Sequence, residues 1–352
     1  MSLSPAREIA FRVLQKVAKG GYATDLLRRE TAQARDVALA ETIVLGCLRY
    51  QAQLDHLIGV FSGKSAKLDE EIRIALRMAV FQLRYLDRIP AHAAVADSVE
   101  LVKLARKRSA TGFVNAVLRK VHRDPIAWPD QAAELSMPPW LLARWQQQYG
   151  VEPAETMARA ALVEPEASVN PETGRQQDIG AQSIVPLLDV QPGMLVLDLC
   201  AAPGNKTAQL VAAGARVVAC DLYAKRLASV DANAERVVLD AAASLPFRAV
   251  FDRVLLDAPC SGTGTLARNP EIKWRLQEAD LGPFADRQKR MLQNALAVLK
   301  PRGRLVYSTC SLEREENEEV VAGLGVTSTH LRQPGRDQGD GFFAAVVEAG
   351  HE

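Results

Sequence analysis

The apolar residues of this chain change their spacing near residue 190, and this change constrains the fold more than any other feature. Before about residue 125 they recur at steps of three and four, and Val44, Leu48 and Leu54 are examples. After residue 190, short apolar runs alternate with helix-like segments, which is typical of a parallel sheet covered by helices. The sequence therefore predicts an all-α bundle followed by an α/β domain.

The helical pattern continues in "EIRIALRMAVFQLRYL", where Ile72, Leu76 and Leu83 lie on one face, and Pro90 interrupts it. We expect a helical domain over 1–125. The next stretch, 126–185, is rich in Pro and Gln and predicts a connector with one helix.

Apolar strands suited to burial on both faces then alternate with helices, which indicates a doubly wound α/β sheet over 186–352. The expected strands are 193–200, 215–221, 236–240, 251–260 and 303–310. The expected helices are 206–214, 224–235, 286–300 and 313–324.

Cysteine use and charge narrow the classes of protein. Five cysteines, an odd number, do not resemble a disulfide framework, so we expect a reducing cytoplasm in which thiols are available for catalysis. There is no CxxC pair, and the five histidines have no ligand-like spacing, so we expect no metal. The chain shows neither a signal-peptide core nor an apolar run long enough to span a membrane.

The net charge of +1 is the sum of a basic N-terminal part and an acidic C-terminal part. Residues 1–130 carry 21 Lys and Arg against 14 Asp and Glu, whereas the remainder carries 22 against 28. The segment 101–123 has seven basic residues and no carboxylate. It is either a solvated helix face or a surface that follows RNA phosphates. The candidate RNA-binding residues are Lys103, Arg106, Lys107, Arg108, Arg119 and Lys120.

The stretch "DLCAAPGNKT", 198–207, follows the first expected strand and opens a helix. Its small residues and Gly204 let the backbone approach a ligand, but it matches neither the GxGxxG fingerprint nor a Walker A loop. Asp221 ends the next strand, where a carboxylate can accept from ribose hydroxyls. An adenosine ligand without a pyrophosphate fits, and S-adenosylmethionine meets that description. Spacing alone leaves another nucleotide open.

Two of the cysteines follow strands that end at the ligand-binding edge. Cys260 and Cys310 occupy these positions, and for Cys47, Cys200 and Cys220 a buried, unreactive side chain is expected. A thiolate beside S-adenosylmethionine suits methylation of a pyrimidine carbon, because its addition at C6 of cytosine makes C5 nucleophilic. Asp257 is placed to protonate or hydrogen-bond N3.

Several motifs in order give the chain a family resemblance. "DLCAAPGNKT", "DAPCSGTG", "RNPEIKW" and "YSTCSLEREENEEVV" resemble those of the bacterial RNA cytosine-C5 methyltransferases of the RsmB/Sun/Fmu type, within the Nop2/Sun family. "GFVNAVLRKV" and "RYLDRIPAHAAVADSVELVK" resemble a NusB-type RNA-binding domain. The resemblance implies a NusB-like bundle followed by a Rossmann-like methyltransferase sheet. It also implies methylation of a loop cytosine in 16S ribosomal RNA, and we expect a monomer.

The same resemblance assigns roles to residues. It implies that Cys310 is the nucleophile and that Cys260 assists product release, although DNA cytosine methyltransferases use the equivalent of Cys260, so the reverse assignment stays open. Lys206 would orient the loop and Asp257. The implied cofactor-binding residues are Cys200, Ala201, Ala202, Pro203, Gly204, Asn205, Lys206, Asp221, Arg226, Asp240 and Asp257.

Three departures from the family pattern stand out. Asn205 replaces a second glycine, and Asn tolerates positive φ better than most residues. The stretch between Asn170 and Gln177 is shorter than usual, which would trim the linker, and the segments after Asp231 and Leu324 are also abbreviated.

Three alternatives stay open. The chain could be an RNA-binding scaffold with an inactive methyltransferase domain, or it could methylate a different RNA. A small-molecule methyltransferase is disfavoured, because it would not need a basic helical domain.

Overall fold

The structure is a computed structural model that describes residues 3–63, 68–231 and 233–349. Its chain forms two units. The helical unit comprises the chain up to Val163 together with Leu266–Arg275, and the sheet unit comprises Glu164–Thr265 and the chain from Leu276 onward. The segment 126–163, expected as part of a separate connector, therefore groups with the helical unit.

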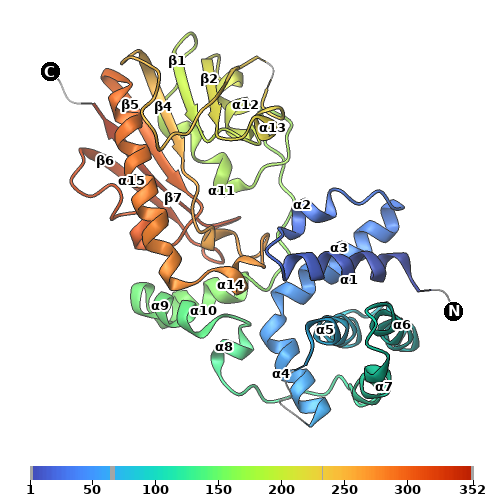
Figure 1. Ribbon diagram of the computed structural model, residues 1–352. Coiled ribbons are helices and arrows are strands. Elements are labelled where there is room, and N and C mark those ends of the chain that lie inside the picture. Colours follow the sequence, from blue (N-terminus) through green and yellow to red (C-terminus); the bar gives the residue numbers. More distant parts are fainter. Residues whose placement is uncertain (1–2, 64–67, 232, 350–352) are drawn as a thin grey trace. The chain divides into compact units, whose positions relative to one another are not determined.

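The helical unit is built from α-helices and one short 3₁₀ helix (Figure 1). They are α1 (Pro5–Val17), α2 (Ala23–Leu27), α3 (Ala34–Arg49), α4 (Gln51–Ser62), α5 (Glu70–Tyr85), α6 (Ala91–Leu104), η1 (Arg108–Ala110), α7 (Thr111–Leu118), α8 (Gln131–Glu134), α9 (Pro139–Tyr149), α10 (Val151–Ala160) and α14 (Ile272–Arg275).

The helix-periodic residues form the core of this unit, as predicted. Val44, Leu54 and Leu76 are fully buried in one cluster, which α1, α3, α4 and α5 share. Arg7 also makes polar contacts across the core: its Nη1 lies 2.7 Å from Asp97 Oδ2, and its Nε donates to Gln82 Oε1 at 2.6 Å. The Arg7 and Asp97 side chains are largely buried, so this ion pair fixes α1 against α6 in a medium that screens charge poorly.

The expectation of one helix in the connector is wrong, because α8, α9, α10 and α11 (Ile179–Gln182) all lie in 126–185. The high proline content of 126–185 favoured a connector in the prediction. Pro139 instead occupies the first turn of α9 and Pro153 the first turn of α10. Proline fits there, since the amide hydrogens of the first turn have no partner within the helix.

The chain enters the helical unit a second time through residues 266–275, here called the returning segment. The ammonium of Lys273 donates to the carbonyl oxygens of Arg49 and Ser136, each at 2.8 Å. Trp274 Nε1 donates to Leu48 O at 2.7 Å, and Glu271 Oε1 accepts from the amide of Ala23. Burial and the charge of Arg49 lower the pKa of Lys273 to about 7. The returning segment thus provides buried polar partners for the bundle.

The sheet unit holds a seven-stranded sheet in the order β3-β2-β1-β4-β5-β7-β6. The first five strands are parallel, and β7 is antiparallel to both β5 and β6. The strands are β1 (Leu195–Leu199), β2 (Arg216–Asp221), β3 (Glu235–Val238), β4 (Phe251–Asp257), β5 (Leu299–Thr309), β6 (Val326–Arg332) and β7 (Phe342–Glu348). The remaining elements are η2 (Val185–Leu188), α12 (Asn205–Ala212), α13 (Ala224–Leu227), η3 (Thr263–Thr265), η4 (Glu278–Asp280), α15 (Leu281–Ala297) and η5 (Arg314–Glu316).

Helices cover both faces of the sheet, which confirms the predicted α/β class (Figure 1). On one face, Met291 and Leu292 of α15 share a buried cluster with Leu197. On the other, η2 and α12 share a second cluster with Val196 and Val217. Neighbouring residues of β1 thus serve opposite cores, as the two-residue period of a strand requires.

Two predicted helices are wrong. Among the described residues of 224–235 only Ala224–Leu227 are helical, and 313–324 contains only the three-residue η5. In the second region, the side chain of Asn317 bonds Thr309 and Ser311 instead of facing solvent. Side chains that bond nearby backbone and hydroxyl groups compete with a regular helix.

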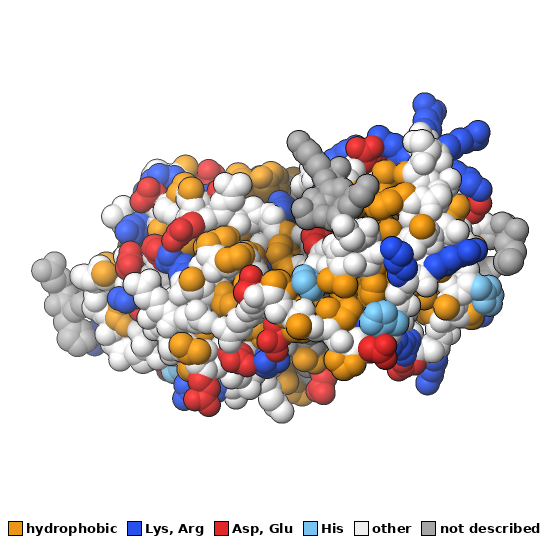
Figure 2. Space-filling view, turned by 90° about the horizontal axis from the view of Figure 1, so that it is seen from below, with side chains coloured by type: hydrophobic (Ala, Val, Ile, Leu, Met, Phe, Trp, Pro, Cys, Tyr) orange, Lys and Arg blue, Asp and Glu red, His pale blue; other side chains and the backbone are white. Residues whose placement is uncertain are grey.

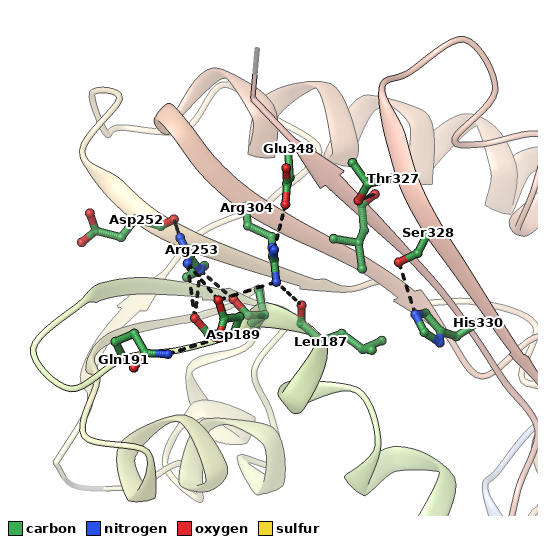
Figure 3. A network of polar contacts seen from close by, with 12 residues as sticks. Leu187, Asp189, Gln191, Asp252, Arg253, Arg304, Thr327, Ser328, His330 and Glu348 are labelled. Atoms are coloured by element: carbon green, nitrogen blue, oxygen red, sulfur yellow. Dashed lines mark hydrogen bonds and ion pairs between the residues drawn. The ribbon is translucent and has the colours of Figure 1, made fainter. Parts of the chain in front are cut away.

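A charged network anchors η2 toward the amino ends of the strands (Figure 3). Arg253 Nε donates to Leu188 O at 2.6 Å, and Arg304 Nη2 lies 2.7 Å from Glu348 Oε1. Asp189 lies 3.8 Å from Arg253 and 3.9 Å from Arg304. Arg253 lies near the start of β4, and Arg304 is its neighbour in β5. This network therefore lies toward the sheet edge opposite the carboxyl ends of the strands.

Within the described ranges, no helix is both long and apolar enough to cross a membrane. The same ranges contain no group of three or more His, Cys, Asp or Glu side chains arranged to hold a metal ion.

Candidate active site

The carboxyl ends of the parallel strands meet along one edge of the sheet. The register pairs Leu199 of β1 with Cys220 of β2, and Asp257 of β4 with Ser308 of β5. Because these strands end level, the loops that follow them share this edge, where ligands bind in doubly wound folds. The loops carry the residues predicted for cofactor binding and catalysis.

The loop after β1 depends on unusual backbone angles. Cys200 has a φ of 64° and Gly204 a φ of 101°. A Cβ atom on Gly204 would lie 2.8 Å from the Cα of Val230, so glycine is required there for space as well as for conformation. The loop then enters α12, whose first amide groups point out of the helix.

The sequence-based explanation of Asn205 was the tolerance of asparagine for a positive φ. This explanation is wrong, because Asn205 does not adopt a positive φ. It is the first residue of α12 and is not among the described residues with positive φ. Its Nδ2 donates to Gln176 O at 3.1 Å. Asn205 thus ties the loop to the turn between Asn170 and Gln177, a contact that glycine cannot make.

Asp221 ends β2 and is nearly fully buried. One carboxylate oxygen accepts from the amide of Tyr223 at 3.0 Å, and the other accepts from the amide of Ala202 at 3.3 Å. Arg226 donates to Ala202 O at 2.9 Å and lies 3.7 Å from Asp221. Three of the predicted cofactor residues therefore form one hydrogen-bonded group.

Asp240 follows β3 and is more open, with 45% of its side chain exposed. Its Oδ1 accepts from the amide of Ala242 at 3.0 Å and lies 3.6 Å from Arg287 of α15. This carboxylate retains exposed surface beside the sheet edge.

A second group joins Lys206, Asp257 and Ser308. Lys206 Nζ lies 2.7 Å from Asp257 Oδ2, and Ser308 Oγ donates to Asp257 Oδ1 at 2.8 Å. Burial lowers the pKa of Lys206, but the charge of Asp257 and its hydrogen bond outweigh this effect, and the pKa is raised overall. Lys206 therefore remains a cation, and its contact holds the Asp257 carboxylate in place.

The sulfur atoms of Cys260 and Cys310 lie 3.3 Å apart. The hydrogen bond with Cys310, burial, and the charges of Cys310 and Glu316 raise the pKa of Cys260 well above its usual range. Cys260 therefore keeps its proton near neutral pH and can donate it to the sulfur of Cys310. The two predicted catalytic thiols thus lie in direct contact at the sheet edge.

The other cysteines differ from this pair. Cys47 and Cys220 are buried and Cys200 is half-buried. Burial raises the pKa of all three thiols, to about 12 for Cys220. Such thiols are poor nucleophiles at neutral pH.

Asp198 is a feature that the sequence did not single out. It is fully buried at the end of β1, and its Oδ2 accepts from Thr207 Oγ1 at 2.6 Å. Its Oδ1 has no hydrogen-bond partner among the described residues. Burial, and to a smaller extent the charge of Asp257, raise the pKa of Asp198 to about 7.

This pKa predicts a pH effect on stability. In the unfolded chain an aspartate titrates at about 3.9. The folded state therefore binds the proton more tightly, and the stabilisation is complete below pH 4 and is lost as pH rises through about 7. Asp198→Asn does not titrate and retains an acceptor for Thr207. We expect its unfolding free energy to exceed that of the unsubstituted protein at pH 8, with the difference shrinking by up to about 1.4 kcal/mol per pH unit toward pH 5.

Denaturant unfolding of the full chain at several pH values between 5 and 8 measures this difference in unfolding free energy. Asp286→Asn, an exposed aspartate on α15, is the matched control and should leave the pH dependence unchanged. Identical pH dependence in Asp198→Asn and the unsubstituted protein would contradict the prediction.

Sequence reasoning missed several polar residues that bond the site residues. Ser308 binds Asp257, Thr207 binds Asp198, and Glu316 binds the serines that follow the two cysteines. A usable signal existed, because Ser308 is a polar residue directly after the buried run Leu305–Tyr307. Buried polar groups are nearly always hydrogen-bonded, so such a residue indicates a partner.

The predicted RNA-binding residues all lie in the helical unit, from the last turn of α6 to the end of α7. Figure 2 shows Lys and Arg side chains gathered over the part of this unit that carries these helices. Lys103 is paired with Glu100 and Lys107 with Asp69, each at 2.7 Å. The exposed residues without an ion pair to any described side chain are Arg106, Arg108, Arg119 and Lys120.

The stretch that the sequence identified as shortened forms a closed turn. Asn170 exchanges backbone hydrogen bonds with Arg175 and Gly174, at 2.8 and 2.9 Å. The side chain of Asn170 accepts from the amides of Glu172 and Thr173. Arg175 then reaches Gly204 O at 3.2 Å, so this turn braces the loop after β1.

Comparison with known proteins gives two family matches. Residues 185–330 match the family described as 16S rRNA methyltransferase RsmB/F, and residues 4–123 match the NusB family. The NusB match lies within the helical unit, and the methyltransferase match lies mainly in the sheet unit.

Two bacterial relatives align along most of the chain. The ribosomal RNA small subunit methyltransferase B of Yersinia pseudotuberculosis serotype O:1b is 30% identical over 420 residues, covering 97% of this chain and 98% of the relative. The probable ribosomal RNA small subunit methyltransferase B of Bacillus subtilis strain 168 is 28% identical, covering 91% and 88%. Because the first alignment is longer than the 352 residues of this chain, that relative has stretches that this chain lacks.

Two solved structures are similar in fold. The crystal structure of PH0851 has a TM-score of 0.78 at 21% identity and covers 99% of both chains. A methyltransferase homolog protein from Pyrococcus horikoshii has a TM-score of 0.51 at 25% identity and covers 63% of this chain and all of that one.

Proposed function

The chain belongs to the RsmB/F family of 16S rRNA methyltransferases, and from this membership we propose that it methylates C5 of a cytosine in small-subunit ribosomal RNA. It is an RNA methyltransferase that uses S-adenosylmethionine. The proposal adds the target atom, a covalent route through Cys310, and a loop cytosine as the target. We also expect a monomer in the cytoplasm.

The residues at the sheet edge fit this cofactor. S-adenosylmethionine carries two positive groups, a sulfonium and an ammonium, and the edge presents the carboxylates of Asp221, Asp240 and Asp257. The buried Oδ1 of Asp198 also lacks a partner among the described residues and can accept a hydrogen bond. Gly204 leaves room where a side chain would collide with Val230. When bound, the cofactor supplies an electrophilic methyl group.

The thiol pair supports a covalent route on the RNA base. The sulfur of Cys310 forms a bond to C6 of the cytosine, and the electron pair of the C5–C6 double bond makes C5 nucleophilic. After C5 has gained the methyl group, it loses its proton to a base, the electron pair re-forms the double bond, and the bond between sulfur and C6 breaks. Cys260, which retains its proton, assists this release.

Asp257 has a matching role at the base. Its carboxyl group, when it carries a proton, would donate a hydrogen bond or that proton to N3 of the cytosine, which stabilises the adduct, and would take the proton back when the adduct breaks down. Lys206 and Ser308 fix both oxygens of this carboxylate, so little reorganisation is needed.

The observation that carries the proposal is the distance of 3.3 Å between the two sulfur atoms, at the same sheet edge as the Lys206–Asp257 pair. A scaffold with an inactive domain would not require this arrangement. Methylation of a different RNA fits the same geometry and remains an alternative outcome of the test.

Bisulfite sequencing of ribosomal RNA tests the proposal. A strain that lacks the gene should lose one 5-methylcytosine, and the purified protein with S-adenosylmethionine should restore it on RNA from that strain. Loss of 5-methylcytosine from another RNA would redirect the proposal, and no loss from any RNA would contradict it.

The basic segment supplies a prediction about RNA binding. If 101–123 follows phosphates, replacing Arg106 and Arg108 by Gln should lower RNA affinity and reduce the slope of log affinity against log salt by about 0.7–0.9 per lost contact. Filter binding at several salt concentrations measures this slope. The charge-matched control replaces Lys289 and Arg290, which are exposed on α15. A slope equal to that of the unsubstituted protein would indicate a merely solvated helix face.

A further inference from the structure

Glu316 is a fully buried acidic residue that the proposed mechanism does not use. It lies at the end of η5, shortly after Cys310 in the chain. It forms no ion pair with any described Lys, Arg or His side chain. A carboxylate buried without a cation is costly unless neutral donors satisfy its oxygens, so its contacts require an explanation.

Four hydrogen bonds satisfy the carboxylate. Oε2 accepts from the amide of Ser261 at 2.8 Å and from Gln288 Nε2 at 2.9 Å. Oε1 accepts from Ser311 Oγ at 2.7 Å and from the hydroxyl of Ser261. Ser261 follows Cys260 and Ser311 follows Cys310, so one side chain holds the residues next to both thiols.

Further bonds hold the backbone of Glu316 and of the residues around it in place. Tyr307 Oη donates to Glu316 O at 2.6 Å, and Asn317 Nδ2 donates to Ser311 O at 2.9 Å. Gln288 Nε2 also donates to Pro259 O, the carbonyl that precedes Cys260, at 3.0 Å. The loops after β4 and β5 are thus joined on both sides of the cysteines.

We propose that Glu316 is a positioning residue for the reaction, whose carboxylate holds the loops of Cys260 and Cys310 together and so sets the spacing of the two thiols. The role in catalysis rests on the proposed function, whereas the effect on the thiols does not. The titratable groups around Cys260 are Cys310, Glu316 and Tyr307. Of these, Glu316 carries a negative charge that favours the neutral thiol of Cys260.

The first experiment needs neither RNA nor cofactor. Alkylation of Cys260 and Cys310 by iodoacetamide is followed by mass spectrometry between pH 6 and pH 10. In Glu316→Gln a negative charge is lost, so the midpoint for Cys260 should move to lower pH. Glu319→Gln, an exposed glutamate of the same segment, is the matched control and should leave the midpoint unchanged. Equal midpoints in Glu316→Gln and the control would overturn the proposal.

The second experiment measures methylation under saturating and limiting RNA. In Glu316→Gln an amide NH₂ faces hydrogen-bond donors that previously bonded a carboxylate oxygen. The kcat of this variant should therefore fall roughly tenfold or more, while its KM for the cofactor stays within about twofold. Glu316→Asp keeps the charge but has a shorter reach. It should retain the alkylation midpoint, because the negative charge is kept, and it should lose part of kcat, because the shorter side chain changes the spacing of the two loops. This variant thus distinguishes the effect of the charge from the effect of the spacing. Full activity in Glu316→Gln would overturn the positioning role.

A second set of variants covers a failure of Glu316→Gln to fold. Ser311→Ala and Ser261→Ala remove hydroxyl contacts to the carboxylate and keep the amide of Ser261. Their combination should lower kcat and retain the melting temperature within a few degrees. Unchanged kcat in the double variant would contradict the proposal. If the unsubstituted protein methylates no cytosine, the proposed function fails, and the alkylation result still decides the effect of Glu316 on the thiols.

Discussion

Replacing Cys310 by serine is expected to abolish methyl transfer and to leave no covalent complex between protein and RNA. A hydroxyl adds poorly to C6 of cytosine, so C5 does not become nucleophilic, and the loss should be on the order of 10³-fold or more. Cys260→Ser should behave differently, because Cys310 can still attack and C5 can still gain its methyl group. If Cys260 serves release, this variant stalls as a protein–RNA adduct.

Denaturing electrophoresis distinguishes the two variants. The adduct of Cys260→Ser should survive denaturation and disappear after nuclease digestion. Cys47→Ala, a buried cysteine of the helical unit, is the control and should behave like the unsubstituted protein. An adduct in Cys310→Ser but not in Cys260→Ser would reverse the assignment, and an adduct in neither would contradict the division of roles.

The second large effect is expected at Gly264, in the loop after Cys260. A Cβ atom there would collide with Gly341 O and lie 2.9 Å from Cys310 O. Both neighbours are backbone atoms whose positions are fixed by hydrogen bonds: Gly264 N donates to Cys310 O at 2.9 Å, and Gly341 N donates to Gly264 O at 2.8 Å. No flexible side chain can move aside.

Gly264→Ala should therefore destabilise the sheet unit by about 3 kcal/mol, the upper end for forcing a methyl group into a packed site. Because the displaced backbone includes Cys310, methylation should fall even at temperatures where the protein is folded. Gly59→Ala adds the same methyl group inside α4, where nothing lies within 4 Å, and should stabilise the protein by up to about 1 kcal/mol. Denaturant unfolding measures both, and equal stability in the two variants would contradict the prediction.

The sequence predicted which residues meet at the carboxyl edge of the sheet, because the physical rule behind that prediction is local. A side chain that follows a buried parallel strand must lie at the carboxyl edge, so Asp257, Cys260 and Cys310 could be grouped without coordinates. Their mutual distances could not be predicted. Glu316 bonds the serines that follow both cysteines, and it lies in the region 313–324, where the sequence predicted a regular helix.

The strands β6 and β7 were missed for different reasons. Most of β6 is exposed and polar, as in "TSTH", so an edge strand of this kind has no apolar alternation to detect. By contrast, 342–347 is a continuous apolar run that follows Gly341, and it should have been recognised as a buried strand.

The returning segment limits how this protein can be divided. Its residues are encoded between those of β4 and α15, yet Lys273 and Trp274 bind carbonyl groups of α3 in the helical unit. A fragment that ends at Val163 would leave the carbonyls of Arg49 and Ser136 without their buried cation. Recombination at a single crossover therefore cannot exchange the helical unit between relatives intact, because part of that unit is inherited with the gene segment of its neighbour.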